Sequence, residues 1–143
     1  MFEFHGWAAI RVPDPDLDVD HRHELERVAV ERLREAIRAA DDQFSLFDVR
    51  MTGNELIVLY AHGLRNHRYK KVIELFRWVA KELPESYGLL YVHDDEVEGR
   101  GNEFQTWRLA RGELREMSDP FLSPRNPTLE DAWHGEPDDE SAA

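Results

Sequence analysis

Apolar and polar residues alternate along the first twelve positions of the chain. The positions on one side of this pattern are Phe2, Phe4, Gly6, Ala8, Ile10 and Val12. The positions on the other side are Glu3, His5, Trp7, Ala9 and Arg11. A period of two is typical of a strand with one buried face. We therefore predict a strand over residues 1–12, which Pro13 ends.

Two later segments carry apolar residues at helical spacing instead. The first begins after Asp20, the predicted N-cap. Its apolar positions are Leu25, Val28, Ala29, Leu33, Ala36, Ile37 and Ala40. The apolar positions of the second are Tyr69, Val72, Ile73, Phe76, Val79, Ala80 and Leu83, and Pro84 stops it. Each pattern predicts an amphipathic helix. Two apolar residues of the second segment, Leu75 and Trp78, lie outside its stripe. We expect them to cover a neighbouring edge or to contact a partner.

The remaining apolar or mixed runs predict five more strands, over residues 43–51, 56–60, 86–93, 104–110 and 114–117. The continuous apolar run at 56–60 predicts a central strand that is covered on both faces. Two tight turns are expected, at Thr52-Gly53-Asn54 and at Arg111-Gly112-Glu113. In the first of them Gly53 is expected to supply a positive φ.

This order of elements, β-α-β-β-α-β-β-β, predicts an α+β fold. Its first six elements match a ferredoxin-like βαββαβ core, with both helices on one face of a mostly antiparallel sheet. The last hairpin then either extends the sheet at one edge or folds across its open face. We expect a single domain over residues 1–127 and an acidic, largely disordered tail over 128–143.

The two ends of the chain carry a recognisable set of residues. They are His5, Trp7, Trp107, Arg111, Gly112, Asp119, Pro120 and Phe121, within the runs 2–7 and 104–124. In these residues the chain resembles the immunity protein 7 family of bacterial polymorphic toxin systems, over roughly residues 1–131. The resemblance implies a cytoplasmic protein that binds and neutralises a cognate toxin domain.

The segment 119–124 has two interpretations. In the first, Phe121 and Leu122 dock onto the body of the protein, and Asp119 accepts a hydrogen bond from Arg111 or from a backbone N–H. In the second, the segment contacts a partner, which requires an exposed Phe121. We favour the first, because two prolines around an apolar pair are typical of a rigid docked segment.

Composition narrows the classes of function. The chain has no cysteine, no apolar run long enough to span a membrane and no signal-peptide pattern, which favours the cytoplasm. A net charge of −12, from 30 acidic and 18 basic residues, argues against nucleic acid and suits a basic protein partner. We find no phosphate-binding loop, nucleophile elbow or converging histidines, so we predict no enzyme, no cofactor and no metal.

The predicted partner surface is the acidic loop after the fourth strand. Its acidic residues are Asp94, Asp95, Glu96 and Glu98, and the nearby aromatic residues are Tyr91 and Trp78. Such a patch pairs with the Lys and Arg of a toxin's cleft and speeds encounter. The alternative is a loop that is only solvated. The partner is thus a cognate toxin domain, and the protein is a monomer or a small homo-oligomer.

The strongest rival is a small regulatory or nucleic-acid-binding module. A ferredoxin-like sheet with exposed aromatic residues, such as His5, Trp7 and Trp107, stacks bases. We prefer the interpretation that Trp7 and Trp107 form a second small core, covered by Phe121 and Leu122.

Overall fold

The computed structural model describes residues 1–13 and 18–125 of the chain. Its strands are β1 (Phe2–Ile10), β2 (Leu46–Met51), β3 (Ile57–Arg65), β4 (Tyr87–Asp94), β5 (Gln105–Ala110) and β6 (Glu113–Ser118). Its helices are α1 (Val19–Ala40) and α2 (Lys70–Glu82). This confirms the α+β class. The predicted acidic tail from residue 128 lies outside the described residues.

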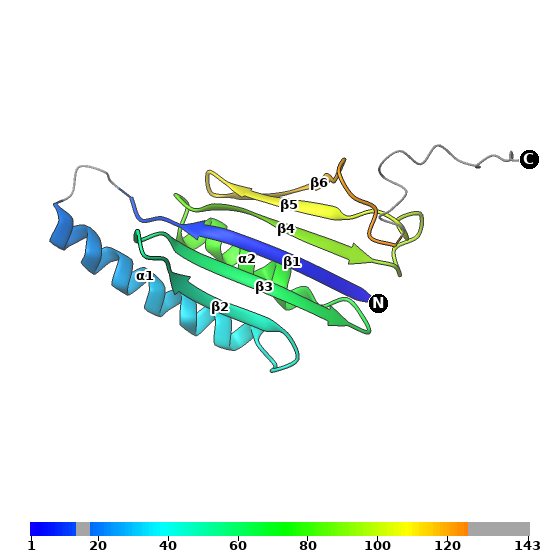
Figure 1. The fold of residues 1–143 in the computed structure, drawn as a ribbon, viewed down its shortest axis with the longest axis horizontal. Coiled ribbons are helices and arrows are strands. Elements are labelled where there is room, and N and C mark those ends of the chain that lie inside the picture. The colour runs from blue at the N-terminus through cyan, green and yellow to red at the C-terminus, as the bar shows by residue number, and fades with distance from the viewer. Residues whose placement is uncertain (14–17, 126–143) are drawn as a thin grey trace, which may run out of the picture.

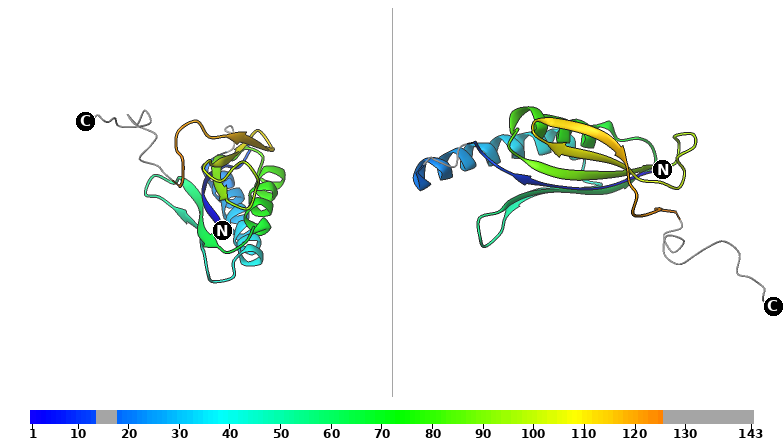
Figure 2. Two further views of the ribbon diagram at one scale, coloured as in Figure 1. Left: turned by 90° about the vertical axis from the view of Figure 1, so that its right-hand side faces the viewer. Right: turned by 90° about the horizontal axis from the view of Figure 1, so that it is seen from above.

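The six strands form one antiparallel sheet in the order β2-β3-β1-β4-β5-β6 (Figure 1). The first four strands and the two helices have the ferredoxin-like order. Of the two placements expected for the last hairpin, the structure has the first: β5 and β6 extend the sheet beyond β4. Both helices lie on one face, and the other face carries no helix (Figure 2).

The core lies between the helices and the covered face of the sheet. Its fully buried side chains are Phe2, Phe4, Ala8, Leu33, Leu59, Ala61, Val72, Phe76, Val79, Leu90 and Val92. The even-numbered positions of β1 thus face the helices, as the alternation predicted. Removing one such Phe from water contributes about 1.5–3 kcal/mol to folding.

Helix α1 begins two residues earlier than predicted. Asp18, not Asp20, is the N-cap: its backbone is extended, and its Oδ1 accepts a hydrogen bond of 2.9 Å from the His21 N–H. Asp20 lies in the first turn, where its charge still favours the positive end of the helix dipole. Of the predicted apolar stripe, Ala29, Leu33, Ile37 and Ala40 are buried, whereas Val28 is exposed. Neither described helix is long and apolar enough to cross a membrane.

The hairpin turns differ from expectation in one case. At the β2–β3 turn the residue with positive φ is Glu55, not Gly53. At the β5–β6 turn Arg111 and Gly112 have φ of 54° and 78°. Two consecutive positive φ angles are those of a type I′ turn, whose twist matches its flanking strands, and glycine adopts them without strain. Glu113 belongs to β6 and not to the turn.

Strand β3 is longer and less covered than predicted. It continues to Arg65, through residues expected to form a loop. It lies inside the sheet, but only one of its faces is covered, because the helices occupy one side alone. Val58 and Tyr60 on its other face are therefore partly exposed, and the expectation of a strand buried on both faces is wrong.

Candidate functional site

The face of the sheet that carries no helix is the candidate site, and we call it the open face. Side chains that are paired across antiparallel strands project to the same side of a sheet. One row of such pairs crosses all six strands, and its members are Asp48, Tyr60, Trp7, Leu89, Arg108 and Arg115. The row has an acidic end, an apolar and aromatic centre, and a basic end.

Trp7 is the centre of this row and is 42% exposed. Its ring makes an edge contact with the ring of Tyr87, with centroids 6.1 Å apart. Tyr87 is 43% exposed, and the guanidinium carbon of Arg11 lies 5.6 Å from its centroid. The two rings support each other at the surface while a large part of each remains in contact with water.

Trp107 lies on the opposite side of the sheet from Trp7. It pairs with Leu90, a core residue on the helix-covered face, and it packs against the core beneath Arg77 of α2. The sheet separates the two tryptophans, so the prediction that they form a second small core is wrong. The smaller cluster on the open face is instead Phe104 with Tyr91 and His93.

The segment after β6 leaves its apolar pair in solvent. Phe121 is 73% exposed and Leu122 is 52% exposed, so the prediction that they dock onto the body of the protein is wrong. Asp119 fixes this segment: its N–H donates to the Phe104 carbonyl at 3.2 Å, and its Oδ2 accepts from the Leu122 N–H at 2.9 Å. The backbone alternative for Asp119 is confirmed, and the exposed Phe121 meets the condition for contact with a partner.

A histidine pair occupies the open face next to Trp7. His5 and His62 are cross-strand partners, and their Nδ1 atoms lie 3.0 Å apart. The Nε2 of His5 lies 2.7 Å from a carboxylate oxygen of Glu3. Burial, and second the nearby His5, lower the pKa of His62 below its ordinary value of 6.5. The arrangement favours a neutral His62 that shares a hydrogen bond with His5 through their Nδ1 atoms.

This pair predicts a loss of stability in mild acid. Because the pKa of His62 is lower in the folded than in the unfolded chain, its contribution is full above about pH 6.5 and declines as the pH falls below it. We expect the melting temperature of His62→Gln to fall less than that of the wild type between about pH 7.5 and about pH 5.5. His21→Gln, at an exposed position on α1, is the control and should follow the wild type. Equal losses in all three proteins would contradict the assignment.

The acidic loop is not a uniform patch of free carboxylates. Asp94 ends β4 on the helix-covered face and is 3% exposed. Its Oδ2 lies 2.9 Å from Nη1 of Arg68, and its Oδ1 accepts from the Glu96 N–H at 3.1 Å. Asp94 is thus a structural residue without surface to offer a partner, and its expected exposure is wrong.

The other three acids of the loop remain accessible. Asp95 lies 2.6 Å from the Met1 ammonium group, and Glu96 lies 2.9 Å from Nδ1 of His67. Glu98 is exposed and has no ion-pair partner among the described residues. Surface pairs of this kind contribute little to stability, so these carboxylates stay available for contact with a partner.

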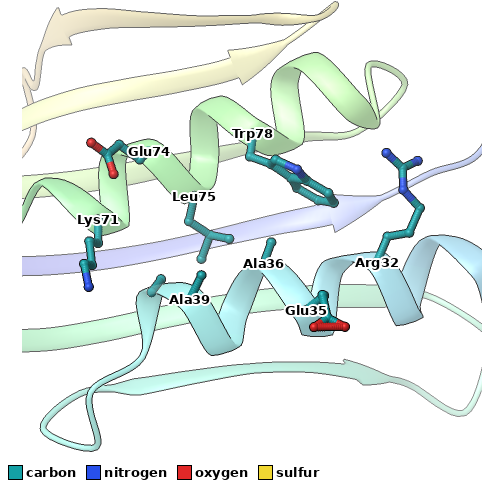
Figure 3. A pocket seen from close by; sticks show the side chains of 9 residues that line it. Arg32, Glu35, Ala36, Ala39, Lys71, Glu74, Leu75 and Trp78 are labelled. Atoms are coloured by element: carbon teal, nitrogen blue, oxygen red, sulfur yellow. The ribbon is translucent and has the colours of Figure 1, made fainter.

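Trp78 belongs to a different surface from the loop and Tyr91. Tyr91 pairs with His5 and so lies on the open face, whereas Trp78 projects from α2 towards α1 (Figure 3). There it lines a groove of about 520 Å³ between the helices, with Leu75 and Ala36 in its floor and charged side chains at its rim. The sheet separates Trp78 from Tyr91, so the expected single contact of loop, Trp78 and Tyr91 does not exist. Leu75, expected to cover an edge or meet a partner, is 3% exposed in the core.

Comparison with known families identifies the family of the chain. A sequence model of the family called immunity protein 7 matches residues 1–131. The chain belongs to the immunity protein 7 family. Comparisons of this immunity protein with curated proteins and with solved structures gave no match.

The residues on which the resemblance rests have different structural roles in this immunity protein. Gly112 and Arg111 form the β5–β6 turn, and Asp119 fixes the segment that presents Phe121. Trp107 packs on the core, whereas Trp7 and His5 lie on the open face. Pro120 follows Asp119 within the turn that the Asp119 carboxylate closes.

One grouping of three metal-binding side chains occurs among the described residues of the immunity protein. The ligand atoms of His23, Glu26 and Glu55 lie within 4.8 Å of one another. His23 Nε2 is already hydrogen-bonded to Glu55 at 2.7 Å. The sequence alone does not indicate this grouping, because the β2–β3 hairpin brings Glu55 to α1 from a distance along the chain. The hydrogen bond between His23 and Glu55 accounts for two of the three side chains, and Glu26 Oε2 lies 4.0 Å from Nε of Arg22.

Proposed function

We propose that this immunity protein acts in the cytoplasm by binding a toxin domain of the same or a related bacterium. It occludes the surface through which the toxin acts and catalyses no reaction itself. The observation that carries the proposal is the match to the immunity protein 7 family over residues 1–131. The open face supports a binding role, because Trp7 and Tyr87 leave large aromatic surfaces accessible on it.

Growth of cells that express the toxin domain tests this proposal. Cells should grow when the immunity protein is co-expressed and should die when it is absent. A toxin domain of another family is the control, and the immunity protein should give no protection against it. Death of the cells in the presence of the immunity protein would contradict the proposal.

The three accessible acids of the loop are proposed to steer the toxin. Replacing Asp95, Glu96 and Glu98 with lysine should slow association by about tenfold or more at low salt and weaken its salt dependence, because the long-range attraction is reversed. The measurement is stopped-flow association at several salt concentrations. A matched control changes Glu24, Glu31 and Glu35 on α1 to lysine, which alters the net charge equally. If the α1 variant is slowed and the loop variant is not, the steering surface lies on α1.

A second candidate is a regulatory module that binds single-stranded nucleic acid. The exposed Trp7 and Tyr87 on a ferredoxin-like sheet favour it. The net charge of −12 opposes it, because nucleic-acid affinity depends on released counterions and needs clustered positive charge. A gel shift with single-stranded RNA at low salt separates the two functions.

A further inference from the structure

Several arginines on the open face have no close carboxylate partner. Arg27, Arg38, Arg65, Arg68 and Arg100 each lie within 3.0 Å of a carboxylate. Arg11, Arg50 and Arg108 have no such partner among the described residues, and Arg115 reaches Glu113 only at 3.7 Å. Arg34 and Arg77 on the helices also lack an ion pair within the described part of the chain, so it is the placement of Arg108 opposite Arg115 that distinguishes the open face.

The register of β5 and β6 places two of these arginines opposite each other, which lowers the stability of the isolated protein. Arg108 and Arg115 are direct cross-strand partners on the open face. Two like charges opposite each other on a sheet destabilise it. An anionic group between the two guanidinium groups removes this repulsion, and arginine binds carboxylates through two parallel hydrogen bonds. The pair is thus suited to a further carboxylate besides Glu113, whose nearest oxygen lies 3.7 Å from Nη2 of Arg115.

The apolar centre of the row adjoins these arginines. Leu89 separates Arg108 from Trp7, and Tyr87 lies beneath Arg11. Tryptophan, tyrosine and arginine are the residues that most often carry the binding energy of protein interfaces. An aromatic centre with a charged border is the anatomy of an interface with another protein.

We propose that the open face docks the toxin through an apolar toxin surface bordered by carboxylates, with Trp7 at the centre of the contact and Arg108, Arg115 and Arg11 opposite the toxin's acids. This inference rests on the proposed function and names the surface and the partner's chemistry. The acidic loop lies at the other end of the strands, where β4 ends, so steering by the loop and docking by the arginines act on different parts of the toxin.

The open face suits a protein better than RNA. Glu3 and Asp48 lie on the same face as Trp7, and both would repel phosphate. A protein surface presents isolated carboxylates that match an arginine pair, whereas an RNA strand presents a regular row of phosphates. The chain's net charge of −12 points the same way.

Calorimetric titration with the purified toxin domain tests the inference through two substitutions on the open face. Trp7→Ala should weaken the affinity by about 30-fold or more, as expected of an interface centre. Arg108→Glu should weaken it by about tenfold or more, because it sets a carboxylate against the toxin's acids. The Arg108 side chain has no hydrogen-bond or ion-pair partner among the described residues, so its variant remains informative even if Trp7→Ala loses stability.

Matched controls lie on the helix-covered side. Trp78→Ala removes the same ring from the groove between the helices, and Arg38→Glu reverses the same charge on α1. Both should keep the affinity within about threefold of the wild type, as peripheral residues do. Unchanged affinity for Trp7→Ala and Arg108→Glu, or a loss confined to Trp78→Ala, would overturn the docking surface and leave the proposed function standing.

Two further outcomes are distinguishable. If the wild-type protein does not bind the toxin domain at all, the proposed function itself fails. The same variants are titrated against a fluorescent single-stranded RNA of about twelve nucleotides, a length within the range of single-strand binding sites. Tight binding of this RNA that Trp7→Ala and Arg108→Glu abolish would overturn the protein partner in favour of RNA.

Discussion

Replacing Gly88 with alanine is expected to loosen the pairing of β1 with β4 and to lower the free energy of unfolding by about 3 kcal/mol. A Cβ at this position would lie 2.0 Å from the Trp7 carbonyl oxygen and 2.7 Å from the Ala8 Cα. Both are backbone atoms of the adjacent strand, so no side-chain rotation relieves the overlap. Since this strand also carries Trp7, the open face depends on the close approach that Gly88 permits.

Thermal unfolding measures this effect, with an expected drop in melting temperature of roughly 10 °C. Gly53→Ala is the matched control, because a Cβ there meets nothing within 4 Å and its φ is not positive. It should leave the melting temperature nearly unchanged. Equal melting temperatures for Gly88→Ala and the wild type would show that β1 and β4 do not approach as closely as the structure has them.

Replacing Asp94 with alanine is the second large expected effect, a loss of about 3 kcal/mol. The substitution leaves the Arg68 guanidinium beside the Phe2 ring without its carboxylate, and it removes the acceptor for the Glu96 N–H. Because the Arg68 side chain is 36% exposed, the loss comes mainly from the two hydrogen bonds that the buried Asp94 carboxylate accepts, each contributing about 1–2 kcal/mol.

Chemical denaturation of Asp94→Ala measures this loss, and Glu98→Ala is the matched control. Glu98→Ala removes an exposed carboxylate from the same loop and should change the stability by less than about 0.5 kcal/mol. A stability of Asp94→Ala equal to that of Glu98→Ala would contradict the structural role of Asp94. It would also indicate that the Asp94 carboxylate is available for contact with a partner.

The layers of this fold follow from periodicity, because local patterns carry that information. The alternation in β1 identified its buried face, and the apolar stripe of α2 identified residues that the structure buries, such as Phe76 and Val79. The order of elements then implied the ferredoxin-like core. The same periodicity also contained the signal for Asp94: Leu90 and Val92 face the helices, and the next even position continues onto that face.

The open face was harder to anticipate, because it depends on register between strands. Whether Trp107 shares a face with Trp7 is set by the pairing of β4 with β5, and one residue of slip reverses it. The opposition of Arg108 and Arg115 follows from the length of the turn at Arg111 and Gly112. Which exposed face a partner uses depends on contacts outside the chain, so no pattern within it identifies the partner's surface.

Titration of toxin activity with the purified immunity protein tests the central claim most directly. If neutralisation is occlusion by binding, activity should fall in proportion to the added protein and reach zero at one molecule per toxin domain. The complex should then release an active toxin domain after mild denaturation, since no bond has been changed. Inactivation by far less than one equivalent, or a toxin that stays inactive after separation, would contradict occlusion and indicate a catalytic protein.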